Sequence, residues 1–336
     1  MITTRSITTN IIKIWRSQCS SWIRFQSTST SSSSVKSQLD EYLTYYNTKK
    51  ELRPYIYRPK NHNKLLTMSI PIKDDYGNII DHATPEPKDP IRPISPKLLT
   101  EYIDSVEDKK ELFKWIKKWT DVTPRKKDVW KLWKPKHLQK LLIKSLTELG
   151  EYSNVLGFIY SQKNKFVQAK NGQVFNVENF FNTVLLCTIL RNNLIKSPNS
   201  TIALKKLKTA WSITQLKENK TGLSNILVQS LEQIQNFNVS NELNGFENKN
   251  LVLPNLSNLD LKHVASNRNK IIQDNELIYF ISRALLERAN LKQIVLPPDI
   301  LTSLQEFIMN FRQLLPDKED KYDKMMKSMN ELYKSK

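Results

Sequence analysis

Apolar positions recur at intervals of three and four residues along most of the chain, which is the spacing of amphipathic helices. The pattern becomes regular at Ser95-Pro96, where an N-cap is followed by proline at the first helical position. Apolar residues continue at helical spacing to Val106, and a second helix is expected over residues 108–119. The chain from this point on is predicted to form helices.

The strongest helical pattern begins near Pro135 and defines a helical hairpin. Its apolar residues repeat as far as Leu149, and Gly150 follows as a residue suited to the left-handed conformation that closes helices. Residues 151–169 are its expected antiparallel partner. Further helices are expected over residues 176–196, 200–217, 270–290, 297–315 and 317–334, and the methionines of the last one should form a packing face.

The hairpins suggest two arrangements of the helices. The pair that starts near Pro135 precedes the next by about 40 residues, which lies in the period range of helical solenoids. The consensus signatures of known helical repeats are absent, and a plain bundle explains the spacing equally well. We therefore predict an all-α fold of helical hairpins that form a bundle or an irregular solenoid.

An extended arm is expected to precede the helices. Residues 53–96 contain eight of the fifteen prolines, and four of them recur at every third position from Pro87 to Pro96, which is the period of polyproline II. Such a segment cannot form a long helix and should run over a neighbouring surface. One hairpin turn is expected at Tyr76-Gly77-Asn78.

The N-terminus has the composition of a mitochondrial presequence. It is rich in Ser, Thr and basic residues, and the first acid of the chain is Asp40. Isoleucines can share one face of a short helix there, and cleavage is expected after Phe25. Removal of residues 1–25 would lower the formal net charge of +19 by only four, so the remaining protein is still strongly basic.

These observations divide the chain into six parts. They are a presequence (1–25), a linker with a short helix (26–52), a Pro-rich arm (53–96), a basic helical-hairpin domain (97–235), an Asn-rich connection (236–269) and C-terminal helices (270–336).

The net charge is the property of the chain that most limits the class of its partner. A protein with a net charge of +19 is expected to bind a polyanion, since self-repulsion of this size is usually relieved by a partner. A membrane surface, or lysines that only keep the protein soluble, are the alternatives. The longest apolar run, residues 183–190, is far shorter than the ~20 residues that a transmembrane helix needs, so we expect no transmembrane segment.

Basic and aromatic residues concentrate in "KKWTDVTPRKKDVWKLWKPKHLQK", residues 117–140. Between residues 109 and 140, twelve Lys or Arg face only three acids. Trp115 and Trp119 are four residues apart and should share the core face of a helix, and the same holds for Trp130 and Trp133 if their segment is helical. The tryptophans are therefore expected in the core, with the cations directed outward.

Such a cluster fits the backbone of structured RNA, which proteins recognise largely by shape and charge. The candidate RNA-binding residues are Lys114, Lys117, Lys118, Arg125, Lys126, Lys127, Lys131, Lys134 and Lys136.

Catalytic chemistry has little support in the sequence. The chain contains no phosphate-binding glycine motif, no nucleophile elbow and no zinc-ligand spacing, and its four histidines are scattered singly. Its two cysteines, Cys19 and Cys187, exclude a disulfide scaffold. We therefore expect no cofactor, no metal and no small-molecule substrate, and we predict that the protein is not an enzyme.

The layout of presequence, Pro-rich arm, basic helical body and charged C-terminal helix resembles the fungal-specific accessory proteins of the mitochondrial ribosome. The hairpin "VWKLWKPKHLQKLLIKSLTELGEYSNVLGFIYSQ" (129–162) is most similar to a small-subunit member. The resemblance implies a structural role in the mitochondrial matrix, with rRNA and neighbouring mitochondrial ribosomal proteins as partners. No binding residue is carried over from the family, so the candidate residues rest on charge alone.

Two other classes remain open at this stage. A helical-repeat mitochondrial mRNA-binding factor, such as a translational activator or RNA-processing protein, would show a regular repeat with polar base-reading positions on one face. An enzyme or a membrane-associated assembly factor would need converging carboxylates or a strongly amphipathic basic helix.

Overall fold

The computed structural model describes residues 32–73, 79–194, 200–235, 238–257, 261–315 and 320–334. The expected presequence and its cleavage site lie outside these residues. The fold is all-α, as predicted, and its only described sheet is a two-stranded hairpin.

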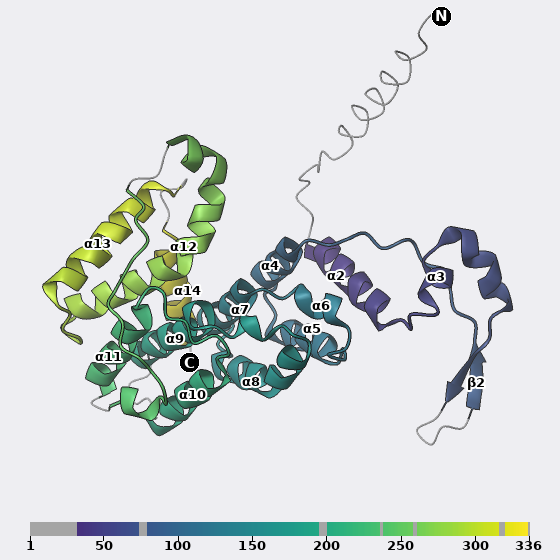
Figure 1. Ribbon diagram of the computed structural model, residues 1–336, viewed down its shortest axis with the longest axis horizontal. Helices are drawn as coiled ribbons and strands as arrows, with labels where there is room; N and C mark the ends of the chain where they lie inside the picture. The colour runs from purple at the N-terminus through teal and green to yellow at the C-terminus, as the bar shows by residue number, and fades with distance from the viewer. Residues whose placement is uncertain are drawn as a thin grey trace, which may run out of the picture.

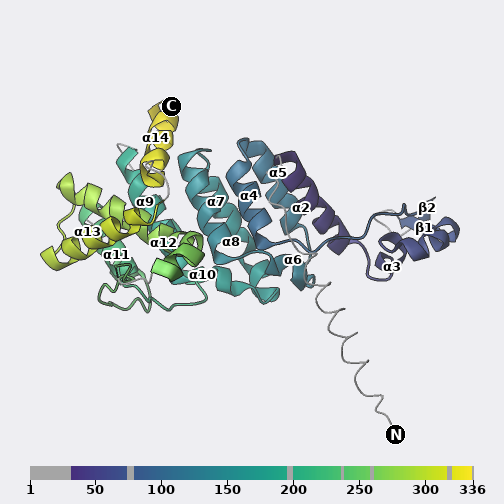
Figure 2. The same ribbon diagram turned by 90° about the horizontal axis from the view of Figure 1, so that it is seen from above.

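The helices stand side by side in an elongated row (Figures 1 and 2). The first part of the row is α2 (Ser32–Asn47), α4 (Pro96–Ser105), α5 (Lys109–Thr120), α6 (Lys127–Lys131), α7 (Pro135–Thr147) and α8 (Tyr152–Gln168). The second part is η3 (Val177–Phe181), a π-helical turn, followed by α9 (Asn182–Leu194), α10 (Ser200–Ile213), α11 (Leu223–Gln235), α12 (Leu261–Asn290), α13 (Pro298–Gln313) and α14 (Lys321–Lys334). Two 3-10 turns, η2 (Gly172–Val174) and η4 (Ser240–Glu242), complete this part.

Helix α7 lies at the centre of the row and contacts α4, α8, α9 and α14. Its apolar face is fully buried: Leu138, Leu141, Leu142 and Leu146 are each at most 1% exposed. Gly150 follows with φ of 67°, the left-handed conformation expected at the end of this helix. One hydrophobic core runs without a break from Val35 in α2 to Met329 in α14.

The boundaries of several helices differ from the expected ones. Helix α12 begins at Leu261 and so includes the last part of the segment that we expected to be a connection. No proline or glycine lies between Pro254 and Pro297, and the Arg268 guanidinium donates to the carbonyl of Leu314 at 2.7 Å, which ties the early part of α12 to the end of α13. Helix α11 was not among the expected elements, although its buried leucines follow helical spacing.

The Pro-rich arm is less extended than expected. It contains α3 (Arg53–Ile56), the 3-10 helix η1 (Pro59–Thr67) and the antiparallel strands β1 (Ile70–Lys73) and β2 (Ile79–Ala83). Prolines occupy the first turn of both α3 and η1, where a missing N–H costs nothing, so these prolines start helices instead of preventing them. The expected hairpin is present and its turn lies outside the described residues. The longest described stretch of the arm without regular structure is residues 84–95.

His137 fixes the start of α7 against the first residue of α4. Its Nδ1 accepts a hydrogen bond from the backbone N–H of Lys134 at 2.9 Å, and its Nε2 donates to the carbonyl of Pro96 at 3.0 Å. The ring must be neutral to make both bonds, because a protonated ring has no nitrogen that can accept a hydrogen bond. Burial disfavours the charged ring and lowers the pKa of His137 to about 4, although the contact with Pro96 opposes the shift.

This pKa predicts a loss of stability in mild acid. The unfolded chain takes up a proton near the ordinary pKa of 6.5, whereas the folded chain does so only near 4, so stability should fall as the pH is lowered from 6.5 to 4. The full effect should approach about 3 kcal/mol. Urea unfolding at several pH values measures it, with His137→Gln as the comparison, because glutamine does not titrate. The same slope against pH in both proteins would contradict the assignment.

Candidate nucleic-acid interface

The basic segment is built on a row of buried tryptophans. In α5, Leu112, Trp115, Ile116 and Trp119 face inward at helical spacing, and each is at most 4% exposed. The Asp108 side chain caps the helix by accepting from the N–H of Lys110 at 2.9 Å. The predicted burial of the tryptophans is therefore confirmed for α5.

The tryptophans of the next segment continue the same aromatic row. Trp119 meets Trp133 edge to face with ring centroids 5.8 Å apart, and Trp130 meets Phe166 of α8 at 4.9 Å. Edge-to-face contacts of this kind add to the stabilisation from burial. Trp130 and Trp133 are also buried, so all four rings serve the core and none is available for stacking on an RNA base.

Hydrogen bonds to the body hold the loop between α5 and α6 in place. The indole N–H of Trp130 donates to the carbonyl of Thr123 at 3.1 Å. The Asn171 side chain donates to the carbonyls of Trp130 at 2.5 Å and Trp133 at 3.3 Å. The bond from Trp130 thus positions the loop that carries Arg125, and the bonds from Asn171 position α6 and the residues after it.

Lysines occupy the face of α5 opposite the tryptophans. Lys110, Lys114 and Lys117 are spaced four and three residues apart, so they form one exposed stripe along the helix. None of the three has an ion pair with another residue in the described part of the chain. Lys110 was not among the predicted residues, although this spacing identifies it.

Three predicted residues are paired with acids of the protein itself. Lys118 contacts Asp40 of α2 at 3.1 Å, Lys131 contacts Asp128 at 3.5 Å, and Lys136 binds Asp274 of α12. Exposed pairs of this kind are worth ~0–1 kcal/mol, so a phosphate can compete for these lysines. Lys136 nevertheless faces α12, away from the stripe on α5.

The remaining predicted residues lie in the loop, in α6 and at the start of α7. Arg125, Lys127 and Lys134 are exposed. Lys126 is half-buried and donates to the Asn47 side chain at 3.4 Å. Burial, and then the nearby charge of Arg53, lower the pKa of Lys126 below its ordinary value. The structure therefore brings together an uncompensated group on α5, the loop and α6, and it separates Lys136 from that group.

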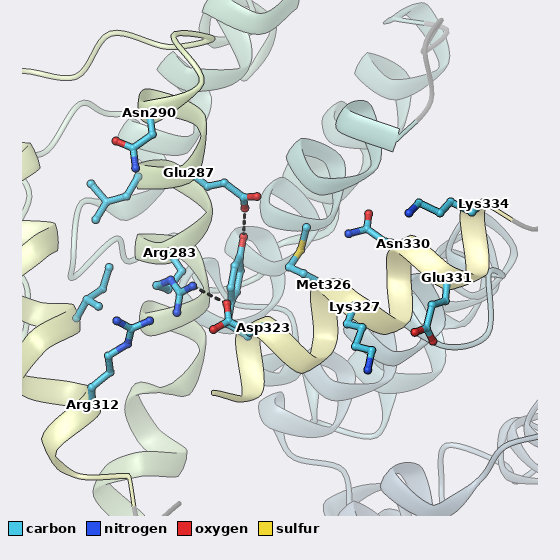
Figure 3. Close-up of a pocket in the computed structure, with 13 residues that line it drawn as sticks. Arg283, Glu287, Asn290, Arg312, Asp323, Met326, Lys327, Asn330, Glu331 and Lys334 are labelled. Carbon is cyan, nitrogen blue, oxygen red and sulfur yellow. Dashed lines mark hydrogen bonds and ion pairs between the residues drawn. The ribbon is translucent and has the colours of Figure 1, made fainter. Parts of the chain in front are cut away.

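A groove of about 760 Å³ lies between α12, α13 and α14 (Figure 3). Its walls carry charges of both signs, including Arg283, Glu287, Arg312 and Asp323. Arg283 binds Asp323 at 2.6 Å, and Glu287 accepts from the Tyr322 hydroxyl at 2.8 Å. The polar side chains that line the groove thus belong to a network of contacts that holds these helices together.

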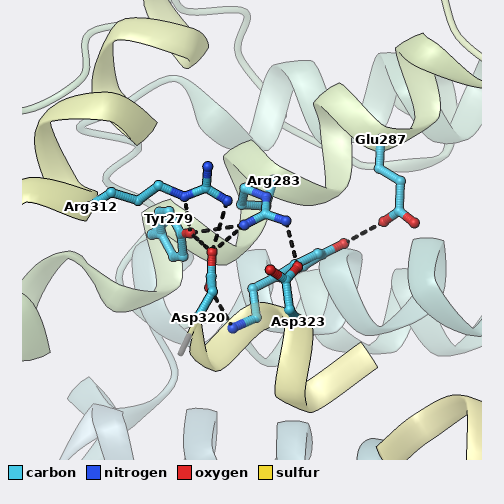
Figure 4. Close-up of polar contacts among 7 residues, drawn as sticks. Tyr279, Arg283, Glu287, Arg312, Asp320 and Asp323 are labelled. Atoms are coloured by element: carbon cyan, nitrogen blue, oxygen red, sulfur yellow. Dashed lines mark hydrogen bonds and ion pairs between the residues drawn. The ribbon is translucent and has the colours of Figure 1, made fainter. Parts of the chain in front are cut away.

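Asp320 is the centre of that network (Figure 4). Its Oδ2 accepts from the Tyr279 hydroxyl, from Arg283 and, at 3.0 Å, from Arg312, and its Oδ1 accepts from the N–H of Tyr322 at 2.9 Å. Burial disfavours the ionised carboxylate, but these hydrogen bonds and charges outweigh it and lower the pKa of Asp320. One carboxylate thereby joins α12, α13 and the start of α14.

Asp320→Asn should destabilise the C-terminal helices by about 1–3 kcal/mol, because it leaves the half-buried Arg283 without its main anion. Asp323→Asn is the matched control, since Asp323 is exposed and binds only Arg283, at 2.6 Å. Amide hydrogen exchange of α14 measures both variants. Equal protection of α14 in the two variants would show that Asp320 is not the anchor.

The described residues offer little for metal, membrane or nucleophile chemistry. They contain no cluster of His, Cys, Asp and Glu that could hold a metal ion. No helix among them combines the length and apolar character needed to cross a bilayer. Cys187 is completely buried, and burial raises the pKa of its thiol, so it is unsuited to act as a nucleophile.

Two family descriptions match the chain and together span nearly all of it. The MRP13-like N-terminal domain matches residues 4–105, and the MRP13-like C-terminal domain matches residues 109–336. The gap between the matches coincides with the turn between α4 and α5. The C-terminal match alone covers more than half of the chain. The chain therefore belongs to the MRP13-like family of mitochondrial ribosomal proteins.

Proposed function

We propose that this protein is a structural component of the small subunit of the mitochondrial ribosome, in the matrix, and that it belongs to the fungal-specific accessory set. The family assignment gives the ribosomal and mitochondrial part of this proposal and implies a structural role without catalysis. The subunit and the fungal restriction rest on the resemblance of the hairpin 129–162.

The proposed contact with rRNA is the exposed basic face of α5, the following loop and α6. The observation that carries it is the uncompensated stripe of Lys114 and Lys117, continued by Arg125 and Lys127, over a rigid tryptophan core. Cations fixed in this way neutralise phosphates without reading bases. Lys118, Lys126, Lys131 and Lys134 border this face, and Lys136 contributes only after release from Asp274.

Neighbouring mitochondrial ribosomal proteins are the other proposed partners. Residues 84–95 run without regular structure beside α2, where ribosomal proteins could pack against them. The alternative of an mRNA-binding factor is not favoured by the family assignment.

Sedimentation tests the ribosomal role directly. A tagged copy of the protein is followed on sucrose gradients of a mitochondrial lysate at moderate and at high salt. We expect co-migration with the small subunit under both conditions. Migration with the large subunit would overturn the subunit assignment, and release at moderate salt would overturn the integral structural role.

Neutralising the proposed face should weaken RNA binding in a salt-dependent manner. For Lys114→Gln/Lys117→Gln/Lys127→Gln, the slope of log K against log[salt] should decrease in magnitude by about 2–3, because each lost phosphate contact removes ~0.7–0.9. Fluorescence anisotropy with a small-subunit rRNA fragment measures the slope. The control Lys249→Gln/Lys324→Gln/Lys327→Gln removes the same charge from exposed residues elsewhere. Equal slopes in the two variants would contradict a specific face.

A further inference from the structure

A separate structural unit projects from the end of the helix row beyond α2 (Figures 1 and 2). This unit, the arm module, comprises α3, η1, β1 and β2, residues 48–73 and 79–83. It has its own small core of Ile56, Tyr57 and Leu65, separate from the main core. The arm module lies at the opposite end of the molecule from the α12–α13 hairpin.

The base of the arm module is fixed to α2 by Arg53. Its guanidinium lies over the rings of Tyr45 and Tyr46, 4.8 and 5.2 Å from their centroids. It also donates to the carbonyl of Tyr46 at 2.8 Å and to that of Thr48 at 3.1 Å. On the other side of the module, the backbone N–H of Lys88 donates to the carbonyl of Ile56 at 2.8 Å. The module therefore has a defined position relative to α2.

The 3-10 geometry of η1 sorts its residues into three rows, since residues three apart eclipse each other. The inward row contains Leu65, which is 2% exposed, and His62, whose ring bonds the carbonyl of Ile56 at 3.1 Å. The two outward rows carry Lys60 and Lys64, both exposed. The local fold thus directs both lysines of η1 away from the small core.

Exposed positive charge dominates the module. Residues 48–70 contain six basic residues and one acid. Five of the cations are exposed, and none of them has an ion pair in the described part of the chain: Lys49, Lys50, Arg58, Lys60 and Lys64. The predicted residues of the body differ in this respect, because three of the nine are paired with acids. The arm module therefore carries a group of uncompensated cations of its own, separate from the group on α5 and α6.

The charge favours an RNA over a protein as the partner of this module. Leu66 is 81% exposed, but on η1 it stands among Lys60, Asn63 and Lys64, so the exposed surface there is mainly polar. A protein interface usually has an apolar centre from which charged residues are depleted. Arg and Lys around a rigid projection are what phosphate oxygens of a structured RNA select.

We propose that the arm module is a second RNA-binding surface of this chain, which binds backbone phosphates of structured RNA through Arg58, Lys60 and Lys64. It rests on the proposed function in that RNA is the partner, but it uses residues outside the proposed face. Because the module is fixed to α2, the two surfaces act as linked contacts, and binding at one raises the effective concentration of the other.

The test uses the full chain and a synthetic RNA stem–loop in fluorescence anisotropy between about 50 and about 200 mM KCl. Arg58→Gln/Lys60→Gln/Lys64→Gln should lower the magnitude of the salt slope by about 2–3. Arg58→Lys/Lys60→Arg/Lys64→Arg keeps the charge and should restore it. The variant Lys249→Gln/Lys324→Gln/Lys327→Gln serves again as the control of equal charge. Circular dichroism verifies that the helix content of each variant is unchanged.

The outcomes separate this inference from the proposed function. A normal slope in the arm variant, together with a reduced slope in the variant of α5 and α6, overturns the arm contact and leaves the proposed face intact. The reverse result supports the arm contact and overturns the face. If the arm variant binds RNA normally but no longer co-sediments with the ribosome, the module binds a protein and the inference is wrong.

Discussion

Burial of the tryptophans in α5 and α6 is the constraint on which the arrangement of the surface depends. Trp115 and Trp119 need the core contacts of their helix, and this fixes the rotation of α5 about its axis. The lysines that alternate with them must then face solvent. Because Trp130 also holds the carbonyl of Thr123, the loop after α5 is positioned by the same core. A basic surface on a rigid core of this kind loses little conformational entropy on binding, which favours recognition of an RNA by shape.

The C-terminal helices are secured by a different kind of interaction. Met325, Met326 and Met329 of α14 are buried, so the expected packing face is present, and the helix contacts α7 at the centre of the row. Apolar packing alone leaves the direction of such a helix weakly specified. Asp320 adds direction, since its hydrogen bonds to Tyr279 and Arg283 are satisfied in one geometry only.

The charge of the protein is distributed so that acids near the body neutralise part of it. Helix α2 supplies Asp40 to Lys118, and α12 supplies Asp274 to Lys136. The outer face of α5 and the arm module have no such partners among the described residues. Repulsion between like charges is therefore concentrated on surfaces where a bound polyanion would neutralise it. This distribution fits a component of a ribonucleoprotein.

The class of the fold, most helices of the body and the inward face of α5 follow from the sequence alone, because helical periodicity and capping are local properties. The sequence also indicated a polyanion as the class of partner and the hairpin in the arm. The set of free cations depends on the tertiary fold, since the partners of Lys118 and Lys136 lie 78 and 138 residues away in the chain. The short helices of the arm likewise depend on contacts of Ile56 and Leu65 that no local pattern of prolines could reveal. Long-range pairing, which sequence spacing does not encode, therefore decides which parts of the basic surface remain open.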